Sequence, residues 1–312
     1  MKYWPTAFLF ITATLTTRSE EFFQTVVDDA WQGAQGYHFS GRLTEIRPAP
    51  LENSGRLGAL YRNTRMLFTS GEPGLVTWHV ADKEWTLRAD DRGYWELAGN
   101  QSLDLPPGWH GIETEPVASS TAGFLVVDPR NPIGLISDID DTILVSDVLS
   151  KRALLKNSLT VSPEKREAVP GMAELYRKLV LKNPAPNATA VFYLSSSPRQ
   201  LTDNLRRFLS VNGFPRGVLQ LKKISREGGD STGDHQAYKL RHLETILAAF
   251  PQVRFHFFGD DAESDPEIYA QVQEKYPERV AGIWIRHLNP NPKRATYPGQ
   301  HAVSELIPRL PE

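Results

Sequence analysis

The sequence of 312 residues contains no cysteine, so disulfides, thiolate catalysis and zinc sites with cysteine ligands are excluded. It also lacks a charge excess, since a net charge of -2 does not mark a general nucleic-acid binder. No stretch is both apolar and long enough to span a bilayer as a helix. The remaining composition, with 40% hydrophobic and 23% charged residues, is ordinary for a globular protein, and the length suffices for two domains.

The N-terminus carries a short apolar run over residues 7–15, preceded by Lys2. This order is typical of a signal peptide, which we expect over residues 1–17, with Ala13 near the cleavage site. Pro5 and the many threonines argue against that interpretation, and the β-branched residues favour a buried strand instead. Because a basic residue precedes the apolar run, we expect export, with a buried strand as the alternative.

The first half of the chain changes texture at about residue 37. Before that point, the apolar spacing over residues 20–31 predicts a short helix. From residue 37 to about 127, short segments rich in β formers alternate with Gly, Pro, Asn and Asp, which predicts an antiparallel sandwich or barrel. We assign residues 20–130 to a small β-rich, sandwich-like domain. Three histidines in this half are expected to be structural or surface residues: His38, His79 and His110.

The centre of the chain holds an apolar run, Ile133 to Ile136, that ends in a group of acids. The run predicts a strand buried on both faces of a parallel sheet. Asp138, Asp140 and Asp141 follow it directly, at the carboxyl end of the strand, where open α/β sheets bind their ligands. Carboxylates this close repel one another, and hard divalent cations such as Mg2+ take oxygen ligands of this kind. An acidic surface turn is the alternative.

A second apolar strand, residues 189–195, ends in three serines. Pro198 is a good first helical residue, so we expect a helix to start there with Ser197 as its N-cap. A hydroxyl at a strand end, beside helix amides, is a ready phosphate ligand. Ser195 is the serine that we favour for this role.

Lys239 lies in the first turns of a helix that Asp234 can cap. A cation is unfavourable at the N-terminal end of a helix, so a purely structural lysine would gain little there. A lysine that neutralises phosphate and a carboxylate nucleophile would explain the position. Lys222 and Lys223, at the end of a strand from residue 217, are the rival candidates, and an exposed strand edge is their alternative explanation.

A further apolar strand ends in Gly259, Asp260 and Asp261. Gly259 permits close approach of a ligand to the backbone. Asp265 precedes Pro266 and is also explained as a helix N-cap, whereas Asp260 has no such structural explanation.

The last strand of the second half covers residues 280–286, and His287 follows it. Strands that alternate with helices predict an α/β fold with a parallel, doubly wound sheet, which we assign to residues 131–312. Arg286 and His287 end their strand and could reach the site, whereas His256, inside its strand, is expected to pack.

The pattern Asp138-x-Asp140-x-Thr142 resembles the first motif of the haloacid dehalogenase superfamily. Several passages together are similar to the actin-patch-protein type of phosphatidate phosphatase: GLISDIDDTI (134–143), VPGMAELY (169–176), FYLSSSP (192–198), FPRGVLQL (214–221) and FGDDAESDPEIY (258–269). The resemblance covers roughly residues 130 to 290 and implies a haloacid dehalogenase-like fold with Mg2+-dependent dephosphorylation. The first half shows little resemblance to this family.

The resemblance implies a role for each motif residue. Asp138 would be the nucleophile, and Asp140 would act as acid and then as base. The phosphate would be bound by Thr142, Ser195, Ser196 and Lys239. Mg2+ would be held by Asp138, the Asp140 carbonyl and Asp260, with Asp261 or Asp265 assisting.

An insert over residues 148–169 mixes leucines with basic residues such as Lys151, Arg152 and Lys156. Its composition suits an anionic amphiphile, although an ordinary amphipathic surface helix is the alternative. We expect hydrolysis of phosphatidate to diacylglycerol, with peripheral membrane contact and no nucleic-acid partner. Two alternatives stay open: a soluble small-molecule phosphatase with the same chemistry, and a non-catalytic cation-binding module.

Overall fold

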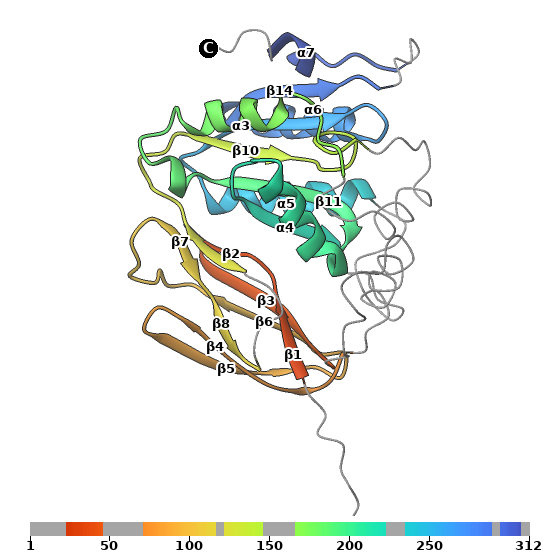
Figure 1. The fold of residues 1–312 in the computed structure, drawn as a ribbon. Helices are drawn as coiled ribbons and strands as arrows, with labels where there is room; N and C mark the ends of the chain where they lie inside the picture. Colours follow the sequence, from red (N-terminus) through yellow and green to blue (C-terminus); the bar gives the residue numbers. More distant parts are fainter. Residues whose placement is uncertain are drawn as a thin grey trace, which may run out of the picture.

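The computed structural model describes residues 23–45, 71–116, 122–145, 166–222, 235–288 and 294–306. The β-rich half, coloured red to yellow, lies below the α/β half, coloured green to blue (Figure 1). Within the described ranges, no helix is long and apolar enough to cross a membrane. The predicted signal peptide, Lys223, Asp234 and residues 148–165 of the predicted insert lie outside the described residues.

Two sheets form the β-rich half. The larger has the order β1-β3-β2-β9-β7, with β6 pairing to β3, and the smaller has the order β5-β4-β8. Their bounds are β1 Phe23–Val27, β2 Ala30–Gly33, β3 Gly36–Glu45, β4 Gly74–Val80, β5 Lys83–Ala89, β6 Tyr94–Gly99, β7 Gly108–Gly111, β8 Glu113–Glu115 and β9 Gly123–Val126. Phe39 packs on Trp78 and Phe124, with ring centroids 4.2 and 4.7 Å apart, so both sheets share one core. The predicted β-rich character is confirmed.

The predicted helix over residues 20–31 is wrong in its described part. The chain forms β1 and β2 there, and both strands pair antiparallel with β3. The spacing of apolar residues did not distinguish a helix from strands here, and the backbone pairing with β3 shows that the residues form strands. The sheets are also not wholly antiparallel, because β2 pairs parallel with β9.

One six-stranded parallel sheet forms the α/β half, in the order β12-β11-β10-β13-β14-β15. Its strands are β10 Ile133–Ser137, β11 Val191–Pro198, β12 Val218–Lys222, β13 Arg254–Asp260, β14 Val280–Arg286 and β15 Gln300–Ala302. The helices are α3 Met172–Val180, α4 Thr202–Val211, α5 His235–Ala249, α6 Asp265–Lys275 and α7 Val303–Leu306, with short 3-10 turns η2 Pro186–Ala188, η3 Arg199–Leu201 and η4 Pro277–Arg279. The mixed α/β class with a parallel sheet is confirmed.

Strand β10 is buried on both faces, as its apolar run predicts. Leu135 faces the core formed with α3 and α4, and Ile136 faces the core formed with α5 and α6. Its neighbours are β11 and β13, with Ser137 in register with Tyr193 and Phe258. The carboxyl ends of these three strands therefore meet where the predicted site residues lie.

The end of β11 differs from the prediction. The strand continues through Pro198, η3 follows, and α4 begins only at Thr202. Ser197 is therefore not a helix N-cap, and Pro198 is not a first helical residue. The extended backbone keeps the serines at the sheet edge, where their hydroxyls find another partner.

Candidate active site

Three carboxylates come together at the carboxyl edge of the sheet. Asp138 follows β10, Asp260 ends β13 and Asp265 opens α6, and each offers an oxygen within 4.8 Å of the others. They are 5%, 1% and 0% exposed. Buried acids at this spacing repel unless positive charge lies among them, and burial raises the pKa of Asp260 to about 7. This all-oxygen donor set fits a hard divalent cation, and it does not identify the metal.

Lys239 supplies part of that positive charge. Its ammonium donates to Asp138 Oδ1 at 2.8 Å and to Asp265 Oδ1 at 2.6 Å, and its side chain is 3% exposed. Burial alone would lower the pKa of Lys239, but the charges of the two aspartates raise it well above its ordinary value. Burial raises the pKa of Asp138 well above its ordinary value, and the charge of Lys239 acts in the opposite direction, toward the carboxylate form.

Asp265 is not the N-cap that its position before Pro266 suggests. It is the first residue of α6, and Ser264 takes the cap position without a side-chain hydrogen bond to the helix. The Asp265 carboxylate instead binds Lys239 and accepts from the backbone N–H of Asp260 at 3.4 Å. Its side chain belongs to the site, so the simple structural explanation is wrong.

Asp140 lies beside the acidic cluster but points elsewhere. Its Oδ2 accepts hydrogen bonds from Ser195 Oγ at 3.0 Å and from Ser197 Oγ at 2.9 Å. Among the described residues, its buried Oδ1 has no hydrogen-bond partner. Desolvation raises the pKa of Asp140, which favours the protonated form that a general acid requires.

The predicted phosphate ligands are placed differently from one another. Ser195 uses its hydroxyl on Asp140, and Thr142 Oγ1 donates to Asp260 Oδ2 at 3.3 Å. The Ser196 hydroxyl is buried without a hydrogen-bond partner in the part of the chain that the structure describes. Ser196 is thus the serine with an uncommitted hydroxyl near Asp140, whereas the sequence favoured Ser195.

Asp261 is not brought into the acidic cluster. Its Oδ1 accepts from the backbone N–H of Leu288 at 2.7 Å, and its Oδ2 lies 3.1 Å from His287 Nδ1. Its carboxylate therefore fixes the chain after β14, and the structure does not support the prediction of a metal ligand. Arg286, at the end of that strand, donates to the Asp141 carbonyl at 2.5 Å, so it reaches the turn after Asp140.

The two rival lysines have different outcomes. Lys223 lies outside the described residues. Lys222 is 2% exposed, with its ammonium 5.6 Å from the ring centroid of Tyr238, so an exposed strand edge does not describe it. The contacts of Lys239 to both aspartates favour it over Lys222.

Sequence reasoning missed one residue near the site. Arg166, assigned to the predicted lipid-facing insert, is partly buried, and its charge lowers the pKa of Asp140. Because the desolvation of Asp140 acts in the opposite direction and is the larger effect, the net shift is still upward. Only the tertiary fold brings the end of the insert back to Asp140, and no sequence signal marks it.

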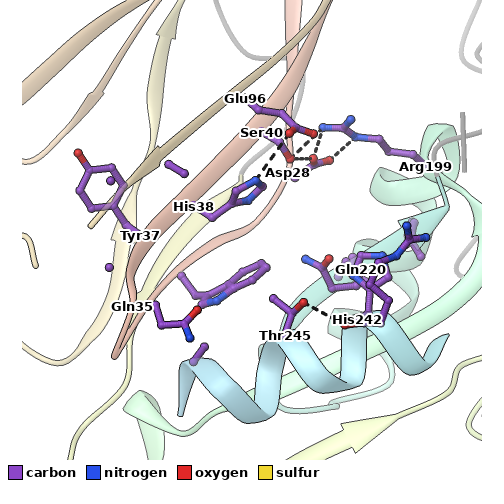
Figure 2. Close-up of a pocket in the computed structure, with 18 of the residues that line it drawn as sticks. Asp28, Gln35, Tyr37, His38, Ser40, Glu96, Arg199, Gln220, His242 and Thr245 are labelled. Atoms are coloured by element: carbon purple, nitrogen blue, oxygen red, sulfur yellow. Dashed lines mark hydrogen bonds and ion pairs between the residues drawn. The ribbon is translucent and has the colours of Figure 1, made fainter. Parts of the chain in front are cut away.

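A cavity of about 820 Å3 lies away from this cluster, between the β-rich half and the α/β half. Figure 2 shows its walls, with His38 and Glu96 on one side and Gln220, His242 and Thr245 on the other. None of the predicted site residues lines it. The chemistry therefore has to be sought at the strand ends and not in this cavity.

Residues 133–287 match the family model described as "Phosphatidate phosphatase APP1, catalytic domain". This segment is similar to the APP1 catalytic-domain family. The resemblance predicted from the motifs over roughly residues 130 to 290 is thereby confirmed. The acidic cluster, Asp140, the three serines and Lys239 all lie inside the matching segment.

Two curated relatives are similar to the chain. Phosphatidate phosphatase APP1 of Saccharomyces cerevisiae is 31% identical over 188 residues, which is 60% of this chain and 30% of the relative. The uncharacterized protein C29B5.04c of Schizosaccharomyces pombe is 30% identical over 158 residues, or 50% of this chain and 25% of the relative. The chain thus matches less than a third of the length of either. A chain of the solved Pnkp1/Rnl/Hen1 complex, at 16% identity and a TM-score of 0.36 over 53% of this chain and 48% of that chain, is too dissimilar to carry an argument.

Proposed function

We propose that this protein is a Mg2+-dependent phosphatase of haloacid dehalogenase-like, doubly wound fold that hydrolyses phosphomonoesters, with phosphatidate as its substrate. The observation that carries the proposal is the pairing of Asp138 with Lys239 beside an acid, Asp140, that is held by two serine hydroxyls. A binding module requires neither feature. The match of residues 133–287 to the APP1 catalytic-domain family model supports the same conclusion.

The first half-reaction uses Asp138 as nucleophile. Because Oδ1 is bound to Lys239, Oδ2 is the oxygen left to attack phosphorus. The new bond joins this oxygen to phosphorus as the bond from phosphorus to the ester oxygen breaks, which gives an aspartyl-phosphate. The departing alkoxide takes the proton of Asp140 and leaves as an alcohol.

The second half-reaction returns the enzyme to its starting state. Asp140, now a carboxylate, removes a proton from a water molecule as that water attacks phosphorus. The bond between phosphorus and the Asp138 oxygen breaks, and inorganic phosphate is released. Ser195 and Ser197 keep the Asp140 carboxyl in one orientation through both steps, and Lys239 offsets the charge on the phosphate and on Asp138.

The carboxylates of Asp138 and Asp260, with the Asp140 carbonyl, would hold Mg2+, which supplies positive charge to the phosphate when bound. Asp265 keeps Lys239 in place, and Thr142 orients Asp260. Ser196 is the hydroxyl free to donate to a phosphate oxygen.

The choice of phosphatidate rests on the name of the Saccharomyces cerevisiae relative and on the composition of the insert over residues 148–169. The test is phosphate release from dispersed phosphatidate and from a panel of soluble phosphomonoesters, each with Mg2+ and with a chelator. We expect release from phosphatidate that depends on Mg2+. Faster release from a soluble ester would assign the soluble alternative, and no release from any substrate would leave the cation-binding module.

Asp138→Asn is the matching variant, because asparagine keeps the shape and can still accept a hydrogen bond from Lys239. It should show no turnover with a circular dichroism spectrum like that of the wild type. Phosphate release at a rate near that of the wild type would remove Asp138 from its role.

A further inference from the structure

Asp28, in the β-rich half between β1 and β2, contacts the α/β half through a buried ion pair. Arg199 donates to both carboxylate oxygens of Asp28, with Nε 2.5 Å from Oδ1 and NH2 bound to Oδ2. Ser40 Oγ donates to the same carboxylate (Figure 2). The side chains of Arg199 and Asp28 are 7% and 14% exposed. This bidentate contact fixes the plane of the guanidinium group.

Arg199 lies directly after the strand end that holds Asp140. Pro198 is the last residue of β11, and Arg199 is the first residue of η3. The Arg199 carbonyl accepts a hydrogen bond from Thr202 Oγ1 at 2.6 Å. Ser197 is two residues earlier, so at most about 7 Å of extended backbone separates it from Arg199. A displacement of Arg199 is therefore transmitted to the serine hydroxyls over a very short length of chain.

Asp29 provides a second anchor from the same link between β1 and β2. Its Oδ1 forms an ion pair with Arg206 of α4 at 3.1 Å, and its Oδ2 accepts from the backbone N–H of Leu219 in β12 at 3.4 Å. The two consecutive acids thus fix the helix that follows the serines and the strand beside them. Apolar packing between the two halves would not require these charged contacts.

Energetics favour a positioning role over a purely stabilising one. Burying an ion pair costs desolvation free energy that the attraction offsets only in good geometry, and apolar pairs often stabilise an interface as well or better. What the bidentate pair provides in addition is a defined orientation. We propose that Asp28 and Arg199 are positioning residues that hold the Ser195–Pro198 segment so that its hydroxyls orient the Asp140 carboxyl. This inference rests on the proposed phosphatase function.

The kinetic test uses Asp28→Asn, which removes the charge and keeps the shape. Misplaced serines would impair proton transfer to the leaving group, so kcat for an alkyl phosphate should fall on the order of 10- to 100-fold. For 4-nitrophenyl phosphate, whose leaving group needs no proton, only the activation of water by Asp140 is impaired, so kcat should fall less than for the alkyl phosphate, and KM should change little for either substrate. Arg199→Gln, and both changes together, should give the same pattern without additivity.

The matched control is Arg216→Met. Arg216 also bridges the two halves, with its guanidinium carbon 4.2 Å from the ring centroid of Trp109, and the charges that act on it are those of Asp29 and Arg206. It should leave the ratio of alkyl to aryl activity unchanged. Thermal unfolding of every variant identifies the losses that come from unfolded protein, since such losses are equal for both substrates.

A measurement that needs no activity separates this inference from the proposed function. Hydrogen–deuterium exchange of peptides over residues 191–201 should be faster in Asp28→Asn than in the wild type or in Arg216→Met. Unchanged exchange, or an equal fall in kcat for both substrates, would overturn the positioning role. A wild-type protein that releases no phosphate would overturn the proposed function, and the exchange rates would still decide whether Asp28 restrains the segment.

Discussion

Lys239→Met removes the cation that donates hydrogen bonds to both Asp138 and Asp265. Methionine retains most of the side-chain volume, so the change leaves two buried carboxylates without their shared partner. Removing one member of a buried ion pair costs about 3–5 kcal/mol of stability. We expect the free energy of unfolding to fall by that amount in the presence of a chelator. The physical reason is that ionised carboxylates in the interior lose their compensation.

Lys222→Met is the matched control for this prediction. Lys222 is equally buried, at 2% exposure, but its ammonium faces the ring of Tyr238 at 5.6 Å, and no acid partner occurs among the described residues. Loss of a cation–π contact costs about 1 kcal/mol. Urea unfolding at neutral pH, followed by tryptophan fluorescence, measures both variants under the same conditions.

Added Mg2+ provides a second arm of the experiment. A cation that binds the folded state stabilises it by mass action, so the loss in Lys239→Met should shrink as Mg2+ is raised, whereas Lys222→Met should show no special gain over the wild type. Equal losses in the two lysine variants with a chelator would refute the electrostatic reasoning. Such a result would mean that the contacts of Lys239 to the two aspartates contribute no more to the free energy of unfolding than the burial of any lysine.

The remaining predictions concern three other parts of the molecule. Asp140→Asn should be nearly inactive on alkyl phosphates and less impaired on 4-nitrophenyl phosphate, and equal loss on both would count against the acid role. Burial lowers the pKa of His256 from 6.5 to about 4, so the unfolded chain takes up its proton first as the pH falls, and stability is lost below pH 6.5. His256→Phe should spare about 2 kcal/mol of the wild-type loss between pH 7.5 and 5.0 in urea unfolding, and identical losses would contradict the assignment. Replacement of Lys151, Arg152 and Lys156 by Glu should reduce activity on anionic vesicles more than on a soluble ester. The higher activity of the wild type on vesicles should shrink as salt rises, because salt screens the surface attraction. A proportional loss on both substrates would leave the insert merely structural.

The α/β half was largely predictable, because burial on both faces leaves a simple pattern in the sequence. The apolar run before Asp138 and the acids at the ends of two strands follow directly from a parallel sheet. Lys239 was identified because a cation near a helix N-terminus needs an explanation, and its contacts to Asp138 and Asp265 provide one.

Hydrogen-bond partners were not predictable in the same way. Ser195 and Ser197 each had a local explanation, as phosphate ligand and as N-cap, but both donate to Asp140, 55 and 57 residues earlier in the chain. Such a choice depends on how two strand ends meet in space. Arg166 was missed for the same reason, since only the return of the insert brings its charge to Asp140.

The α/β half depends on contacts from residues that lie before the start of the family match. The match begins at residue 133, yet Trp31 packs edge-on against Phe192 with ring centroids 5.7 Å apart, and Asp28 neutralises Arg199. A fragment cut at residue 133 would expose the apolar surface that Trp31 covers and leave Arg199 without its counter-ion. The smallest unit suitable for expression therefore starts ahead of Phe23, well upstream of the segment that the motifs delimit.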